Sequence, residues 1–239
     1  MKYIIAFQQG SKAMLIKNDF RYPAMLNLTG KRCVVVGGGA VAARKLASLC
    51  EAAADVEVVA PEFFGELQET ARRYGCRLLR AAYAPEYIRG AFVVVAATDD
   101  ATVNRQITAD APCLCNNITE PELSNFIVPS SFRQGNITVA VTTGGMPAFT
   151  RRLKNLLRQT VTPELADFND FLRRQRALVR QIPSTPEERT EFWRRALNEE
   201  ILNLVTAGQA ELAKEKIVNA ISGFRTQSQN GSRGNTRTF

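Results

Sequence analysis

The sequence predicts an α/β protein: a doubly wound parallel sheet, followed by a β-hairpin and a helical C-terminal domain. Short apolar runs alternate with helical patterns over residues 28–118, and glycines follow the first run in the segment KRCVVVGGGAVAARK. Strands that are apolar throughout are typical of parallel sheets whose two faces are both covered by helices. From Pro147 onward the periodicity is helical, which predicts the C-terminal domain.

The elements of the sheet follow one another in order. RCVVVGG is predicted to be a buried strand, AVAARKLASLCEAA a helix and DVEVVAP a strand. PEFFGELQETARRYG has the pattern of a helix, with Pro61 in its first turn and Gly75 just past its end. CRLLRAAY and AFVVVAATDD are the next strands, DATVNRQITAD a helix, and CLCNNI the last strand.

The remaining chain is predicted to form a hairpin and helices. NFIVPSSFRQGNITVAVTT contains two strand-like runs around a turn at Gly135. Four helical segments follow, and Ser184 or Thr185 is expected to cap the third, with Pro186 in its first position. The expected parts are a lead-in (1–24), a dinucleotide-type sheet domain (25–120), a hairpin region (121–147), a helical domain (148–224) and a disordered polar tail (225–239).

Composition excludes several classes of protein. Hydrophobic residues make up 45% and charged residues 23% of the 239, as in ordinary globular proteins. No apolar run approaches the roughly 20 residues of a membrane span, and MKYIIAF lacks the features of a signal peptide. The five cysteines are scattered, without a CxxC pair, and the chain has no His. We therefore expect a cytoplasmic protein with reduced thiols, no membrane partner and no resident metal.

The net charge of +8 favours an acidic partner, and most of the excess lies from Arg151 onward. No aromatic residues interleave the basic ones, so nucleic acid is not expected. The alternative is that these charges form only a solvated helical face and a basic tail.

The glycines predict a Rossmann-like dinucleotide site. Gly37, Gly39 and Ala42 fit G-x-G-x-x-A between a strand and a helix: the first allows the tight turn, the second admits the pyrophosphate and the third lets the helix pack on the strand. The alternative is a glycine turn without a ligand. No acid closes the second strand, although Glu62 lies slightly later, and no Arg stands there to accept a 2′-phosphate. NAD is therefore favoured over NADP.

A second polar motif, AATDDATVN, lies at the carboxyl end of a predicted strand, where doubly wound sheets bind their ligands. Four side chains there are candidates for contact with the cofactor: Thr98, Asp99, Asp100 and Asn104. The competing interpretation is that Thr98 or Asp99 caps the following helix.

Four segments in this order, MLNLTGKRCVVVGGGAVAARK, VVVAATDDATVN, CNNITEPELSNFIVPSSFRQGNITVAVTTGG and PAFTRRLK, resemble the precorrin-2 dehydrogenase and sirohydrochlorin ferrochelatase family of siroheme synthesis. The resemblance implies a homodimer, built by the hairpin and the C-terminal helices, that oxidises precorrin-2 to sirohydrochlorin with NAD. In some members the same site also inserts ferrous iron. The tetrapyrrole, a polycarboxylate, would be the acidic partner of Arg133, Arg151, Arg152 and Lys154.

The resemblance assigns the cofactor positions to the first turn and to the loop after the second strand: Gly37, Gly38, Gly39, Ala40, Val41, Pro61 and Glu62. It also places Thr143 near the substrate. Two positions depart from the family motif. Thr119 stands where the family has an Asp important for its chemistry, and Gly145-Met146-Pro147 lacks the family's Ser.

Thr119 cannot act as a base at neutral pH, which leaves three alternatives. Glu120 takes the place of the missing Asp, or cofactor positioning and product aromaticity drive the oxidation, or the chain binds dinucleotide and tetrapyrrole without turnover. Iron insertion has less support, because without His only Asp99, Asp100, Glu120 and Glu122 offer carboxylates on this rim. A dinucleotide-sensing module and a dehydrogenase of other substrates are further alternatives.

Overall fold

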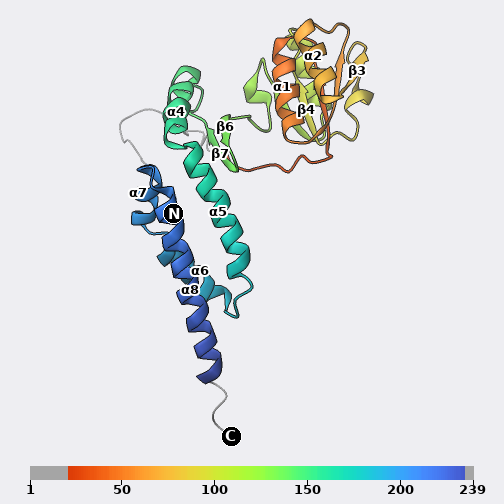
Figure 1. Cartoon of the computed structure of the whole chain (residues 1–239). Coiled ribbons are helices and arrows are strands. Elements are labelled where there is room, and N and C mark those ends of the chain that lie inside the picture. The colour runs from red at the N-terminus through yellow and green to blue at the C-terminus, as the bar shows by residue number, and fades with distance from the viewer. Residues whose placement is uncertain (1–20, 235–239) are drawn as a thin grey trace, which may run out of the picture. The chain divides into compact units, whose positions relative to one another are not determined.

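The computed structural model describes residues 21–234, with side chains up to residue 229. They fall into two compact units that divide between Val128 and Pro129 (Figure 1). Most of the predicted lead-in and the last residues of the predicted tail lie outside the described residues. Among the residues described, no helix is long and apolar enough to cross a membrane.

The first unit is a parallel sheet in the order β3-β2-β1-β4-β5 (Figure 1). Its strands are β1 (Arg32–Val36), β2 (Asp55–Ala60), β3 (Arg77–Arg80), β4 (Val93–Ala96) and β5 (Leu114–Asn117). They alternate with α1 (Ala40–Glu51), α2 (Gly65–Tyr74), η1 (Pro85–Ile88) and α3 (Ala101–Asp110), and η2 (Pro121–Leu123) follows β5. The strand order reverses direction between β1 and β4, the switch point at which such sheets bind ligands.

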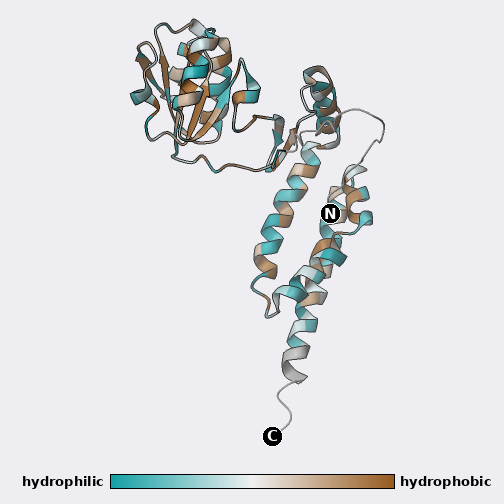
Figure 2. Cartoon of the chain, turned by 180° about the vertical axis from the view of Figure 1, so that it is seen from behind, coloured by the Kyte–Doolittle hydropathy of each residue, from teal (hydrophilic) through white to brown (hydrophobic). Residues whose placement is uncertain are grey.

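Helices cover both faces of this sheet, which confirms the predicted doubly wound class. One core cluster joins Ala42, Leu46 and Leu67 of α1 and α2 to alternate strand residues such as Val35 and Val58. The other joins Ile107 of α3 and Ile88 of η1 to the intervening strand residues. Figure 2 shows apolar residues concentrated on the strands. Such runs of β-branched residues are stable only where both faces are buried.

Two boundaries differ from the prediction. Helix α2 begins at Gly65 rather than at Pro61, because the Phe64 N–H donates to the Gly38 carbonyl at 3.1 Å and holds the preceding residues in a loop. The cap of α3 is Asp100, not Thr98 or Asp99: its carboxylate accepts from the N–H groups of the first helical turn. Gly75 ends α2 with φ 70°, as predicted.

The second unit contains a hairpin and a helical bundle. Strands β6 (Ser130–Gln134) and β7 (Ile137–Val141) pair antiparallel around Gly135, whose φ is 55°. The helices are α4 (Pro147–Thr160), α5 (Pro163–Val179), α6 (Pro186–Ala196), α7 (Glu199–Thr206) and α8 (Ala210–Gly234). Helices α5, α7 and α8 share a core, whereas α4 packs on the hairpin. Thr185 forms the predicted capping box with Glu188, and Pro186 begins α6.

Two helical predictions were wrong. The third predicted helix is split into α6 and α7, because the Asn198 side chain accepts from the Ile201 N–H and starts a new helix. Helix α8 also continues into the segment predicted to be disordered from residue 225. Phe224, one residue before this segment, packs against the core of the helical bundle and stacks on Phe192, which anchors the helix at this point. The hydroxyls of Thr226 and Ser228 donate to carbonyls one turn earlier, each at 3.1 Å.

Candidate functional site

The three glycines after β1 have different surroundings, which decide why each position suits glycine. Gly37 has φ 136°, and a Cβ there would lie 2.2 Å from the Ala97 carbonyl oxygen at the end of β4. A Cβ on Gly38 would lie 1.8 Å from the Glu62 carbonyl oxygen. These two glycines therefore let the loops after β4 and β2 close on the first turn.

Gly39 differs, because a Cβ on it would meet nothing within 4 Å. It is the N-cap residue of α1, in extended conformation, and no side chain caps the helix. The N–H groups of the first turn, which begins with Ala40 and Val41, therefore have no side-chain cap at the positive end of the helix dipole, and the space beside Gly39 is open. Ala42 is fully buried, as the third position of the motif requires for close packing. This geometry suits a pyrophosphate.

The loop after β2 covers one side of this cradle. Pro61 and Glu62 are exposed, and the backbone of Glu62 lies against Gly38. Arg80, the last residue of β3, was not predicted to belong to this site; it pairs in register with Ala60. Its exposed guanidinium lies 5.8 Å from the centroid of the Phe63 ring and forms no ion pair with a described carboxylate. Only the pairing of β2 with β3 reveals that this cation lies beside the loop after β2.

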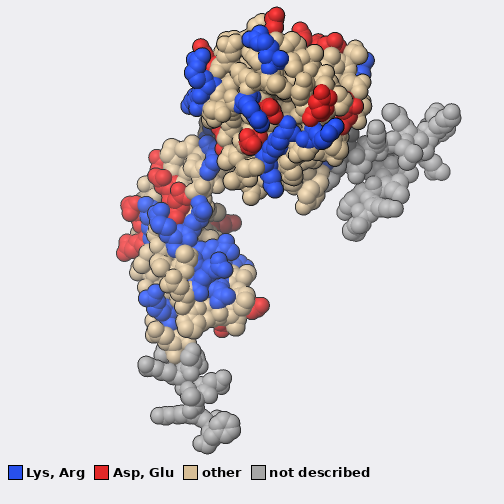
Figure 3. All heavy atoms as spheres, turned by 90° about the vertical axis from the view of Figure 1, so that its right-hand side faces the viewer, with Lys and Arg blue, Asp and Glu red and all other residues tan. Residues whose placement is uncertain are grey.

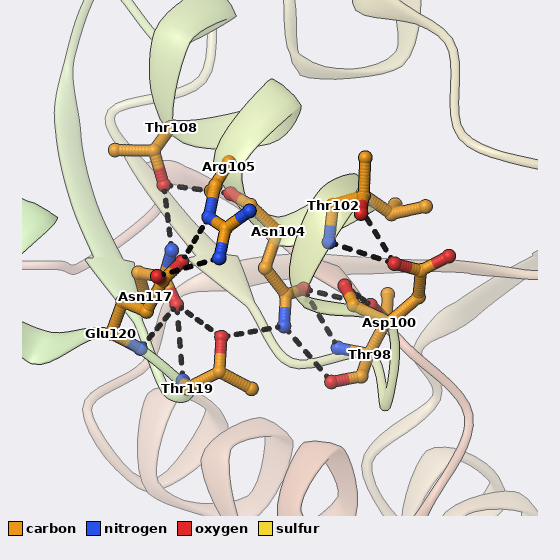
Figure 4. Close-up of polar contacts among 10 residues, drawn as sticks. Thr98, Asp100, Thr102, Asn104, Arg105, Thr108, Asn117, Thr119 and Glu120 are labelled. Atoms are coloured by element: carbon orange, nitrogen blue, oxygen red, sulfur yellow. Dashed lines mark hydrogen bonds and ion pairs between the residues drawn. The ribbon is translucent and has the colours of Figure 1, made fainter.

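The loops after β4 and β5 are joined by a buried amide (Figure 4). Asn104 of α3 is fully buried; its Oδ1 accepts from the Thr98 N–H at 3.1 Å and from the Thr98 hydroxyl at 2.8 Å. Its Nδ2 donates to the Thr98 carbonyl at 2.9 Å and to the Thr119 hydroxyl at 3.2 Å. The Thr119 hydroxyl in turn donates to Asn117 Oδ1 at 2.9 Å. Asn104 therefore positions the rim and does not itself face the cofactor space.

The other rim candidates take separate positions. The Asp100 carboxylate is used in capping α3, accepting from the Thr102 N–H at 2.7 Å. Thr98 is half-buried and bonded to Asn104, and Asp99 is exposed. The structure thus brings Thr98 and Asn104 together with Thr119, leaving Asp99 as the rim carboxylate that faces solvent.

Replacing Asn104 with Asp is expected to lower the free energy of unfolding by about 2–3 kcal/mol, because it removes a buried donor and sets a carboxylate against the Thr98 carbonyl. Protonation of that Asp would restore a donor, so the deficit relative to the parent should shrink as the pH falls. Urea unfolding at two pH values measures both effects. Asp99→Asn, on the same loop but exposed, is the control and should shift stability by less than about 0.5 kcal/mol. Equal stability of Asn104→Asp and the parent would contradict the network.

Glu120 does not point freely into this rim. Both of its carboxylate oxygens accept from Arg105 of α3, at 2.7 Å from Nε and 2.9 Å from Nη2 (Figure 4). This bidentate pairing raises the pKa of Arg105 and engages the carboxylate that one of the three alternatives assigned to replace the missing Asp. Thr119 is exposed, but its proton is already donated to Asn117.

Thr143 belongs to the second unit, where it closes the turn before α4. Its hydroxyl donates to the Met146 carbonyl at 3.1 Å and bonds to the Thr150 hydroxyl. Gly144 and Gly145 adopt φ 62° and 100°, which only glycine takes up without strain. The turn therefore fixes where α4 begins.

Basic side chains gather over the second unit on the face shown in Figure 3. Within the part of the chain that the structure describes, no carboxylate forms an ion pair with Arg133, Arg151, Arg152 or Lys154. The Arg133 guanidinium instead donates to the Gly135 carbonyl at 2.7 Å. These unpaired charges leave the second unit able to attract an anion.

Each of the two units contains a region that matches a known protein family. Residues 24–130 match a family model for NAD(P)-binding, and residues 164–221 match one for the sirohaem synthase dimerisation region. Both units of the chain therefore resemble parts of siroheme synthases. This confirms the resemblance to precorrin-2 dehydrogenases and sirohydrochlorin ferrochelatases.

Individual siroheme synthases are similar to this chain over most of the chain's length. The siroheme synthase of Nitrosococcus oceani is 34% identical over 84% of the chain, and that of Nitrosospira multiformis 36% identical over 80%. The chain spans only 44% and 42% of these proteins. A solved structure of SirC, precorrin-2 dehydrogenase, matches 85% of the chain with a TM-score of 0.71 at 24% identity, which supports the fold.

Proposed function

We propose that this protein oxidises precorrin-2 to sirohydrochlorin, with NAD as hydride acceptor. The observation that carries the proposal is the open, uncapped N-terminus of α1 at Gly39, in a chain whose two units resemble parts of siroheme synthases. Open space before free N–H groups is the feature that separates a phosphate cradle from an ordinary glycine turn.

The choice of NAD over NADP is part of the proposal. A dinucleotide whose pyrophosphate lies at Gly39 would place its adenosine ribose toward the loop of Pro61 and Glu62. The Glu62 carboxylate would repel a 2′-phosphate, whereas Arg80 would attract one. Glu62 belongs to the loop that contacts the cradle, which favours NAD. Titration with both dinucleotides tests this choice.

The substrate and the assembly belong to the same proposal. The unpaired charges of Arg133, Arg151, Arg152 and Lys154 would bind the carboxylates of a tetrapyrrole. The match of residues 164–221 to a dimerisation region supports a homodimer. Five free cysteines support a cytoplasmic location.

We further propose that oxidation depends on cofactor positioning rather than on a carboxylate base. The bidentate ion pair with Arg105 engages both carboxylate oxygens of Glu120, so that neither oxygen is free to approach a proton of the substrate. Thr119 and Thr143 then act by holding their loops in place. Alignment of the donor carbon and the nicotinamide, together with the aromaticity of the product, supplies the driving force.

Glu120→Gln is expected to lower kcat by less than about 10-fold, whereas loss of a true general base costs about 10²–10⁴-fold. Arg105→Gln is the matched control, because it breaks the same pair but frees the carboxylate. The two variants should lose similar activity. A large loss in Glu120→Gln alone, with Arg105→Gln unimpaired, would identify Glu120 as the base.

The decisive experiment is anaerobic incubation of the purified protein with precorrin-2 and NAD, following NADH and the tetrapyrrole spectrum. NADH that appears in step with sirohydrochlorin establishes the dehydrogenase. Binding of both ligands without turnover would instead identify a binding protein that has lost catalysis at position 119.

Iron insertion stays a prediction of the resemblance alone. Of the carboxylates expected to assist it, Asp100 caps α3 and Glu120 pairs with Arg105. Asp99 and Glu122 are exposed. Adding ferrous iron to the finished reaction, and following the siroheme spectrum, tests this second activity.

A further inference from the structure

Two thiols outside the candidate site lie in contact. Cys50 is in the last turn of α1, and Cys76 follows Gly75, the residue that ends α2. Their Sγ atoms are 3.2 Å apart, and both side chains are half-buried rather than enclosed. Solvent and small oxidants can therefore reach the pair, unlike the thiols of Cys33 and Cys115, which are buried.

The surroundings of the pair favour covalent chemistry over metal binding. No group of three or more Cys, Asp or Glu residues suited to a metal ion occurs in the described part of the chain. A disulfide has an S–S distance of about 2.0 Å, so bond formation requires the two sulfurs to approach by only about 1.2 Å. Half-buried side chains at the ends of two helices can supply such a shift by rotamer adjustment.

We propose that Cys50 and Cys76 are a modification site, which two-electron oxidants of the peroxide or glutathione disulfide class convert into a reversible intramolecular disulfide. With hydrogen peroxide, a thiolate attacks one peroxide oxygen and breaks the O–O bond; the sulfur becomes a sulfenic acid, and the departing hydroxide takes up the proton that the thiol released and leaves as water. The second thiol then attacks the sulfenic sulfur, forms the S–S bond and expels a second water. One peroxide is reduced by two electrons, and the two thiols lose two hydrogens.

The environment of Cys50 makes the reaction depend on pH. Burial, followed by the hydrogen bond to Cys76, raises the pKa of Cys50 to about 12. Cys50 is therefore a poor source of thiolate at neutral pH. The reaction should accelerate as the pH rises, because the thiolate is the nucleophile.

The bond would connect the two helices that leave the cradle. Helix α1 begins just after Gly39, its N-cap residue, and α2 begins just after Phe64, whose N–H donates to the Gly38 carbonyl. The near ends of both helices therefore already meet at the glycine turn. A disulfide would tie their far ends and close a loop over residues 50–76. We expect oxidation to raise the thermal midpoint of the first unit by several degrees, and dithiothreitol to reverse the rise.

Peptide mapping of the intact chain tests the proposal. The purified protein is treated with glutathione disulfide or with hydrogen peroxide, digested with trypsin without reduction and analysed by mass spectrometry. Trypsin places Cys50 in the peptide of residues 46–72 and Cys76 in the peptide of residues 74–77. Cys33 falls in the peptide 33–44, and Cys113 and Cys115 fall together in the peptide 106–133. The expected product joins 46–72 to 74–77 and lacks two hydrogens.

Matched variants sharpen the result. Cys76→Ser should abolish the cross-link and the thermal shift, while Cys113→Ser, which removes another half-buried thiol, should leave both unchanged. Stable glutathione adducts on Cys50 or Cys76 without the cross-link, or a cross-link to another peptide, would overturn the proposal. Peptide mapping of the unmutated chain tests the cross-link even if a variant does not fold. Because no cofactor or substrate is present, the outcome is independent of the proposed enzymatic activity.

Discussion

Replacing Gly39 with Asp is expected to weaken NAD binding by at least ~100-fold, without lowering the stability of the fold. The position has extended backbone and no neighbour within 4 Å of a Cβ, so the side chain fits. Asp is a favoured N-cap residue, and its carboxylate would accept from the same N–H groups that a pyrophosphate needs. It would also place a negative charge beside the phosphates. The substitution therefore stabilises α1 slightly while it closes the cradle.

Titration calorimetry with NAD and thermal unfolding measure the two effects separately. Gly39→Asn is the matched control, since it caps the helix with the same shape but adds no charge, and about a 10-fold loss of affinity is expected. Gly38→Ala provides a contrast, because its Cβ would strike the Glu62 backbone and should destabilise the unit. NAD affinity unchanged in Gly39→Asp would mean that the dinucleotide does not bind at the start of α1.

The sequence predicted the elements of the fold correctly where the residues that determine an element lie close together in the chain. The run of β-branched residues before Gly37 and the good helix formers after Gly39 predicted β1, the turn and α1. The capping box at Thr185 and the left-handed Gly75 were also predictable, because each depends on residues within one helical turn. The same is true of the hairpin at Gly135.

Contacts between distant segments were not predictable in this way. Helix α2 starts late because its first loop is tied to Gly38 in another part of the chain. One alternative let Glu120 reach the rim, but Arg105, one helix earlier, pairs with it through a contact between α3 and the loop after β5. Arg80 enters the site only through the register of β3 with β2. Asn104 was identified as a candidate, yet only its complete burial shows that it positions other groups.

Thr119→Asp is expected to raise kcat for precorrin-2 oxidation by ~10- to 100-fold, because it restores a proton acceptor where the family motif has Asp. Thr119 is exposed, so a carboxylate there faces the rim, and Arg105 is already occupied by Glu120. The Asp could accept the hydrogen bond that Asn104 now donates to the threonine hydroxyl. Asn117 Oδ1 would lose one donor but keep the N–H groups of residues 119 and 120, each at 3.0 Å.

Thr119→Asn distinguishes the effect of a proton acceptor from the effect of side-chain shape. The Asn side chain has the size of Asp and an acceptor oxygen, but it cannot take up a proton at neutral pH. The rate of Thr119→Asp should fall as the pH drops through the pKa of the new carboxyl, since the protonated acid cannot accept a proton, whereas Thr119→Asn should show no such decline. Equal rates for the two variants would show that chemistry at this rim does not use a carboxylate. Turnover that appears only in Thr119→Asp would show that the parent chain binds its ligands but lacks the group that completes the reaction.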